Sequence, residues 1–156
     1  MDPSLTQQSR ELAELVASLG DMFRIQEHDQ LCCYDVTVSE CRTLSFLRRE
    51  PFHILTMHEI AGMLHVTRSG ATRIIDKLVS KGYVTREADA VDGRVSRVTP
   101  TPSGLALIER IEHEAAERQQ RILEQMTPEM RQIVVIALQA LARANKRTPT
   151  PEAHES

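Results

Sequence analysis

The sequence has no tryptophan, and aromatic residues make up only 3% of its 156 residues. Its hydrophobic residues, 41% of the total, must therefore form a mainly aliphatic core. No apolar run approaches the roughly 18 residues that a membrane-spanning helix needs, and residues 1–26 lack the basic start and apolar block of a signal peptide. We expect a soluble, cytoplasmic protein with no membrane partner.

Catalytic motifs are also missing. The sequence contains no nucleophile elbow, phosphate-binding loop, HExxH zinc motif or paired-carboxylate pattern. A Cys–His nucleophile pair is the remaining basis for catalysis, and no accompanying motif supports one. We therefore expect that the protein is not an enzyme.

The sequence also lacks an overall basic charge. The net charge of −3 argues mildly against a polyanionic partner, because binding to nucleic acid needs clustered Lys and Arg. Although the whole chain is acidic, residues 66–97 are locally basic, since they hold seven basic and four acidic residues. The basic residues are Arg68, Arg73, Lys77, Lys81, Arg86, Arg94 and Arg97. This segment is the predicted place for contact with DNA.

The sequence does contain clear helix signals. Over residues 5–26 apolar side chains recur at spacings of three and four, the pattern of one helix face. Thr37 with Glu40, and Thr56 with Glu59, have the spacing of capping boxes, and Thr67 can cap a further helix. The predicted helices span residues 5–26, 38–49, 57–64, 68–81, 102–125 and 128–147.

The helix predicted over residues 68–81 has an apolar stripe on one side and short, polar and basic side chains on the other. Gly82 can end it, and a hairpin with strands at 83–86 and 94–99 is predicted to follow. This order predicts a mainly α (α+β) fold, a winged helix-turn-helix with a two-stranded wing and a helical dimerisation region. The predicted contacts to double-stranded DNA are Thr67, Arg68, Ser69, Thr72, Arg73 and Lys77 on the helix and Arg94 and Arg97 on the wing.

From the wing into the next helix, the sequence follows the pattern DxRxxxVxLTxxG at Asp92, Arg94, Val98, Thr101 and Gly104, with Pro100 in place of the leucine. Together with the upstream HEIAGMLHVTRSGATRIIDKLVSKGYVTR, this pattern resembles the MarR family of transcription regulators. The resemblance implies that Asp92 holds the wing tip through a salt bridge and that Arg94 contacts the minor groove. It also implies a homodimer, and we expect a repressor that binds a pseudo-palindromic operator.

Dimerisation also agrees with the residues themselves, because the last two helices carry more apolar surface than a small winged domain can cover. We predict a single winged-helix domain over residues 1–147. Its DNA-binding core spans 36–100, and its dimerisation helices span 5–26 and 102–147. We predict that the tail, residues 148–156, is disordered.

Three cysteines, Cys32, Cys33 and Cys41, lie within ten residues. Without an export signal, a metal-bound, redox-active or free thiol is expected rather than a structural disulfide. Thiolates favour zinc, other soft metals and Fe–S clusters. The further candidate ligands are Glu27, His28, Glu40 and His113. Resemblance to zinc-sensing members of the family implies ligands among Cys32 and Cys33, Glu40 and Cys41, and Glu112, His113 and Glu117.

Several alternatives remain open at this point. Glu40 is also explained as a capping partner and Cys41 as an apolar packing residue. The effector can be a metal, an oxidant or a small phenolic molecule, and in the last case the cysteines are structural. The basic surface can also be the solvated side of a module that binds a partner other than DNA.

Overall fold

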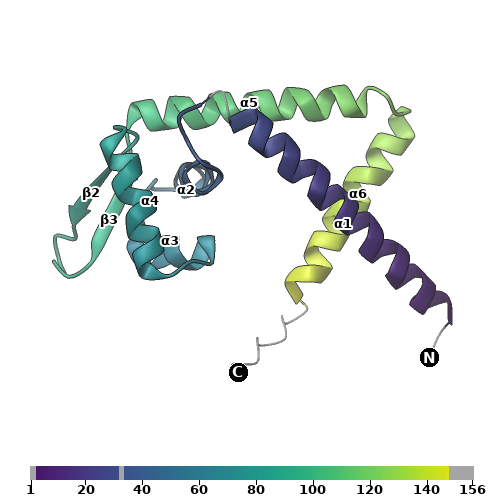
Figure 1. Ribbon diagram of the computed structural model, residues 1–156, viewed down its shortest axis with the longest axis horizontal. Coiled ribbons are helices and arrows are strands. Elements are labelled where there is room, and N and C mark those ends of the chain that lie inside the picture. Colours follow the sequence, from purple (N-terminus) through teal and green to yellow (C-terminus); the bar gives the residue numbers. More distant parts are fainter. Residues whose placement is uncertain (1–2, 32–33, 148–156) are drawn as a thin grey trace. The chain divides into compact units, whose positions relative to one another are not determined.

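The computed structural model describes residues 3–31 and 34–147. Its elements, shown in Figure 1, are α1 (Pro3–Leu31), α2 (Val38–Arg49), β1 (Leu55–Thr56), α3 (Met57–Leu64), α4 (Arg68–Ser80), β2 (Val84–Ala88), β3 (Ser96–Pro100), α5 (Pro102–Leu123) and α6 (Pro128–Arg147). None of the helices in these residues is long and apolar enough to cross a membrane.

Residue contacts divide the chain within α5 into two units, Met1–His113 and Glu114–Ser156. The predicted single domain and its internal boundaries stay a prediction, and the predicted disordered tail lies outside the described residues.

Capping boxes start α2 and α3, as the sequence predicts. The Thr37 hydroxyl accepts from the Glu40 N–H at 3.3 Å, and the Glu40 carboxylate accepts from the Thr37 N–H at 2.9 Å. Thr56 and Glu59 repeat the arrangement at 3.3 and 2.7 Å. The N–H and hydroxyl of Thr56 lower the pKa of Glu59 because both donate to its charged form. Both helices have the predicted bounds, since the caps satisfy backbone donors that would otherwise be orphaned.

Three helices end at residues other than the predicted ones, and one of them is α5, which ends at Leu123 and not at residue 125. The prediction that the first helix ends at residue 26 was wrong, because α1 continues to Leu31. Residues 26–31 lose the apolar periodicity but contain no Gly or Pro to break a helix. α4 ends at Ser80, and Gly82 has the predicted left-handed conformation with φ of +75°. Its N–H donates to Val79 O at 2.9 Å, and Tyr83 N–H donates to Leu78 O at 2.9 Å, which closes the helix.

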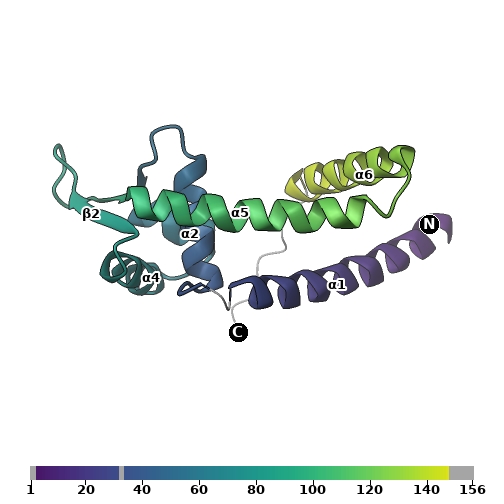
Figure 2. The same cartoon turned by 90° about the horizontal axis from the view of Figure 1, so that it is seen from above.

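The sheet has three antiparallel strands in the order β1-β3-β2. The predicted hairpin is present as β2 and β3, and its tip projects beyond the helices in both views (Figures 1 and 2). β1 was missed, because a strand of two residues has no alternation of polar and apolar residues to detect. Leu55 of β1 and Arg86 of β2 flank Val98 of β3 in register.

The core of the first unit is aliphatic, as the composition predicts. It joins α2, α3, α4, the sheet and the first half of α5. The hydrophobic residues with no exposed surface are Leu44, Leu47, Ile60, Ala71, Ile75, Leu78 and Val98. Because three of these belong to α4, that helix is held by its inner face and its outer face is left for a partner.

Candidate nucleic-acid interface

The outer face of α4 begins at its N-cap. The Thr67 hydroxyl accepts from the Gly70 N–H at 3.1 Å and lies 3.1 Å from the Ser69 hydroxyl. A side chain at Gly70 would meet Thr67 Oγ1 at 3.3 Å, so the first turn is compact. Among the predicted DNA contacts on this helix, Thr72 is half-buried, and Thr67, Arg68, Ser69, Arg73 and Lys77 are exposed. The structure therefore places these six residues on one accessible stretch of α4.

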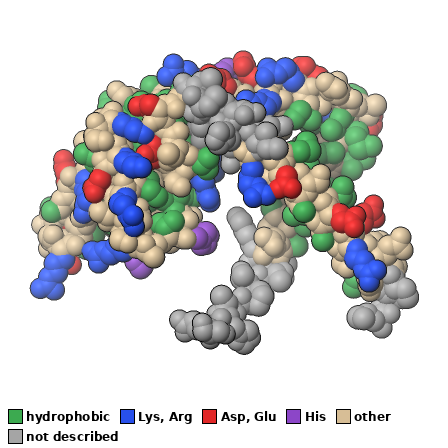
Figure 3. Space-filling view, viewed as in Figure 1, with side chains coloured by type: hydrophobic (Ala, Val, Ile, Leu, Met, Phe, Trp, Pro, Cys, Tyr) green, Lys and Arg blue, Asp and Glu red, His purple; other side chains and the backbone are tan. Residues whose placement is uncertain are grey.

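The seven basic residues of the segment 66–97 fall into two groups. Three form ion pairs within the protein, namely Lys81 with Glu40, Arg86 with Asp76 and Arg97 with Asp89. The other four are Arg68, Arg73, Lys77 and Arg94, and their side chains form no ion pair with the side chains that the structure describes, those of residues 4–24 and 34–145. Figure 3 shows Lys and Arg spread over α4 and the hairpin, with acidic side chains between them. The positive charge left for a polyanion thus comes from the second group.

Asp89 organises the wing tip. Its carboxylate accepts from the N–H groups of Val91 at 2.8 Å and Asp92 at 2.9 Å, and it pairs with the guanidinium of Arg97. The N–H of Asp92, followed by that of Val91, lowers the pKa of Asp89 because these donors stabilise the charged form. The tip is therefore held by hydrogen bonds that depend on an ionised carboxylate.

This arrangement corrects the expected role of Asp92. The carboxylate of Asp92 accepts from the Arg94 N–H at 3.0 Å, and the salt bridge expected of it is made by Asp89. Asp92 shapes the turn instead, as Asp side chains often do by bonding to backbone two residues on. Arg97, predicted to contact DNA, is exposed but paired with Asp89, whereas Arg94 is exposed at the tip and forms no ion pair with a described side chain.

A second cluster anchors the C-terminal end of α4. Lys81 Nζ lies 2.7 Å from Glu40 Oε2 and also donates to the Asp35 carbonyl. The Tyr83 hydroxyl donates to Asp35 Oδ1 at 2.8 Å, and this bond raises the pKa of Tyr83 because it stabilises the protonated phenol. Sequence spacing offered no signal for these pairs, since their partners lie more than forty residues apart.

Gly104 allows the wing to join α5 closely. A Cβ at this position would lie 2.1 Å from the Tyr83 carbonyl oxygen, which is too short for any side chain. Thr101 completes the junction, because its N–H donates to that same oxygen at 3.0 Å and its hydroxyl donates to Gly82 O at 2.7 Å. The Thr and Gly of the wing pattern are thus explained by backbone contact.

The structure describes only part of the predicted thiol site. Cys32 and Cys33 lie outside the described residues, as do the side chains of Glu27 and His28. Cys41 is half-buried on α2 and forms no disulfide with a described residue. Glu40 beside it is engaged by Thr37 and Lys81. Within the described residues no three His, Cys, Asp or Glu side chains come together as a metal site.

The candidate ligands on α5 have other surroundings. Glu112 accepts from the Ser45 hydroxyl at 2.6 Å and pairs with Arg48 of α2 at 2.5 Å. His113 is exposed and lines an open pocket of about 690 Å³ with Arg48, Glu112 and neighbouring residues of α5. The ligand sets expected from zinc-sensing relatives therefore stay a prediction.

A helix-turn-helix formed by α3 and α4, followed directly by the hairpin β2–β3, defines a winged-helix protein. The sequence model of the MarR family matches residues 34–95, which contain these elements up to the wing tip. Over this segment the chain is similar to the MarR family.

Known proteins agree with this assignment. The chain is 27% identical over 110 residues to the HTH-type transcriptional regulator PapX of Escherichia coli, an alignment that covers 70% of this chain and 67% of PapX. The chain therefore spans about two thirds of the length of this curated relative. A MarR family protein from Bacillus stearothermophilus has a TM-score of 0.84 at 20% identity, with 94% of this chain and 99% of that chain covered. The S. aureus MepR-DNA complex has a TM-score of 0.68 at 22% identity, with 85% and 96% covered.

Proposed function

We propose that this protein is a sequence-specific DNA-binding transcription regulator that binds a pseudo-palindromic operator as a homodimer, and that it acts as a repressor. The observation that carries the proposal is the group of four basic side chains, Arg68, Arg73, Lys77 and Arg94, that have no internal ion pair among the described residues. They lie on the outer face of a helix suited to the major groove and at a wing tip suited to the minor groove. The names of PapX as a regulator and of MepR as part of a DNA complex support the same role.

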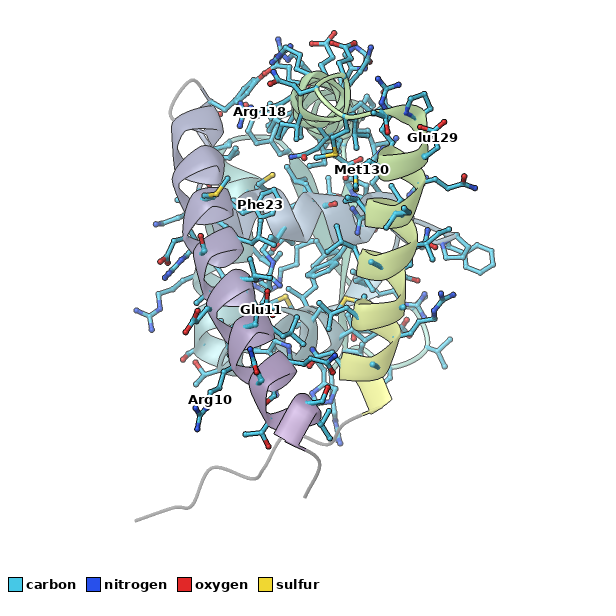
Figure 4. All side chains as sticks on the ribbon, turned by 90° about the vertical axis from the view of Figure 1, so that its right-hand side faces the viewer. Arg10, Glu11, Phe23, Arg118, Glu129 and Met130 are labelled. Atoms are coloured by element: carbon cyan, nitrogen blue, oxygen red, sulfur yellow. The ribbon has the colours of Figure 1, made fainter. Side chains whose placement is uncertain are left out.

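The apolar faces of α1 and α6 support the homodimer. Along α1, Leu12, Leu15, Val16, Leu19 and Phe23 form one stripe, and each is between 39% and 55% exposed in the single chain. Figure 4 shows Phe23 and Arg10 on opposite sides of α1, and Met130 pointing in a different direction from Glu129 on α6. On α6, Ile133 and Ile136 are more than half exposed. Stripes of this size on two helices are typical of an interface with a second copy.

The salt dependence of duplex binding tests the proposal. If each of the four basic residues in both protomers neutralises one phosphate, the logarithm of the affinity falls with the logarithm of salt concentration with a slope of up to about −7. Arg94→Ala is expected to make the slope shallower by about 2 per dimer. The measurement is fluorescence anisotropy with an operator selected from random-sequence duplexes, between 50 and 200 mM salt (roughly the range in which such losses are measured).

A matched control comes from α1. Arg10 is exposed on the side of the helix opposite the apolar stripe, so Arg10→Ala should leave the slope unchanged. A slope near zero for the wild-type protein would contradict DNA binding and favour a module for another partner. An equal change in slope from both variants would contradict the assigned interface.

We also propose that Cys32, Cys33 and Cys41 form the input of the regulator, as a thiol-bound metal, an Fe–S cluster or a reversibly oxidised site. The support is the spacing of three thiols within ten residues and the position of Cys41 next to Glu40, whose ion pair with Lys81 reaches the end of α4. A ligand there can change DNA affinity only by binding two conformations unequally.

The input is tested by metal, iron and labile sulfide analysis of protein purified without oxygen, together with operator affinity in reduced, oxidised and metal-loaded states. Cys33→Ser is the variant expected to remove the response. An operator affinity that is the same in all three states would contradict a thiol input and favour a regulator that binds a small phenolic molecule.

A further inference from the structure

Thr72 occupies a central position on the outer part of α4. It lies four residues after Arg68 and four before Asp76, so the three side chains follow one row along the helix. Asp76 pairs with Arg86 of β2 at 3.3 Å, and this pair locates the end of the row beside the wing. The neighbouring Ala71 is fully buried against the core. Thr72 thus lies between the wing and Arg68, which forms no ion pair with a described side chain, on the surface that we propose faces DNA.

The hydroxyl of Thr72 is already used within the helix. It donates to the Arg68 carbonyl oxygen at 3.0 Å. A β-branched side chain has few χ1 rotamers in a helix, so this bond also sets the position of the methyl group. Because the hydroxyl hydrogen is donated to backbone, the side chain offers a partner its methyl group and an oxygen that can only accept. Ser69 and Ser80 on the same helix also bond within the protein, but they carry no methyl group.

In the major groove, one base presents a methyl group of its own, the C5-methyl of thymine. We propose that Thr72 is a specificity-determining residue that selects thymine by contact between these two methyl groups. The inference rests on the proposed function and adds the chemistry of one base position in each half-site. Burial of one methyl group corresponds to about a fourfold change in affinity. Two half-sites multiply this to about 15-fold, because contacts at separate positions are roughly additive.

The test removes the methyl group from either partner. Each thymine of the selected operator is replaced in turn by deoxyuridine, which lacks only the C5-methyl. Each half-site is expected to contain one position at which this single replacement weakens binding by about fourfold. The loss should be the same at every salt concentration, because no charge is changed. Thr72→Ser removes the methyl group from both protomers, so it is expected to weaken binding to the thymine operator by about 15-fold and to bind the thymine and deoxyuridine operators equally. Thr72→Val, which keeps a methyl in the same place, is expected to retain the preference.

Controls separate this contact from other effects. Deoxyuridine outside the half-sites should leave the affinity for DNA unchanged. The matched protein control is Thr127→Ser, which removes a methyl group at the N-cap of α6 and keeps the hydroxyl that accepts from Met130 N–H. This variant should also leave the affinity unchanged. The inference is overturned if Thr72→Ser still prefers thymine, or if Thr72→Val loses the preference. The deoxyuridine series leaves the protein unchanged, so a folding defect in a variant cannot decide the result. Wild-type binding with a steep salt slope but no deoxyuridine effect overturns this inference alone. Absence of duplex binding overturns the proposed function as well.

Discussion

The ion pair between Lys81 and Glu40 gives a prediction with a magnitude. Glu40 is 1% exposed, and its Oε2 receives the Lys81 ammonium at 2.7 Å and the Thr37 N–H at 2.9 Å. The other oxygen, Oε1, has no hydrogen-bond partner among the described residues. Lys81→Met keeps most of the aliphatic chain and removes the charge. A buried carboxylate would then be left with a single donor.

The expected cost follows from burial. Removing one partner of a buried ion pair typically destabilises a protein by about 3–5 kcal/mol. The Lys81 side chain is 26% exposed, so water can partly replace it, and we expect the lower end, about 3 kcal/mol. Adding Glu40→Gln to Lys81→Met removes the buried negative charge that has lost its partner, and keeps a carbonyl oxygen to accept from the Thr37 N–H. The double variant should therefore be more stable than Lys81→Met alone, with a coupling energy of about 1–3 kcal/mol.

Urea unfolding at one fixed protein concentration measures these free energies for the wild type, both single variants and the double variant. Lys77→Met is the matched control, because Lys77 is exposed on the same helix and forms no ion pair with a described residue. It should change stability by less than about 0.5 kcal/mol. If Lys81→Met costs no more than this control, or if the two single costs simply add, the buried pair does not anchor α4.

Three further predictions concern the wing, the junction and the dimer. Gly104→Ala should destabilise the fold by about 1–3 kcal/mol in urea, because its Cβ would lie 2.1 Å from Tyr83 O; an unchanged midpoint would contradict this. The pKa of Asp89 is lowered, so its support for the wing is present above its ordinary pKa and is lost as pH falls through the lowered value. Amide NMR signals of Val91 should titrate in that acidic range and not in Asp89→Asn, and a midpoint at the ordinary pKa would refute the assignment. Leu15→Glu should convert the dimer to a monomer in analytical ultracentrifugation, and a dimer that persists would remove α1 from the interface.

Local sequence signals predicted much of the fold. The starts of α2 and α3 were predicted from capping boxes, which depend on residues three apart, and both are present. Gly82 was predicted to close α4 because glycine adopts the left-handed conformation, and it does so. The alternating, turn-rich stretch after it indicated the hairpin, although its strands are displaced by one or two residues. Where the prediction failed, at the end of α1 and at β1, the local pattern was weak or too short.

The sequence by itself determined the class of the protein: helix caps, periodicity and the wing pattern are local properties, and they indicated a winged helix that resembles the MarR family. Only the tertiary structure decided which charges are available to a partner. Arg94 and Arg97 look equivalent along the chain and both are exposed, yet Asp89 pairs with Arg97 and not with Arg94. Lys81 is one more basic residue in the sequence, but folding brings it to a buried carboxylate forty-one positions away. Ion pairing depends on distance in space, and sequence order does not record that distance.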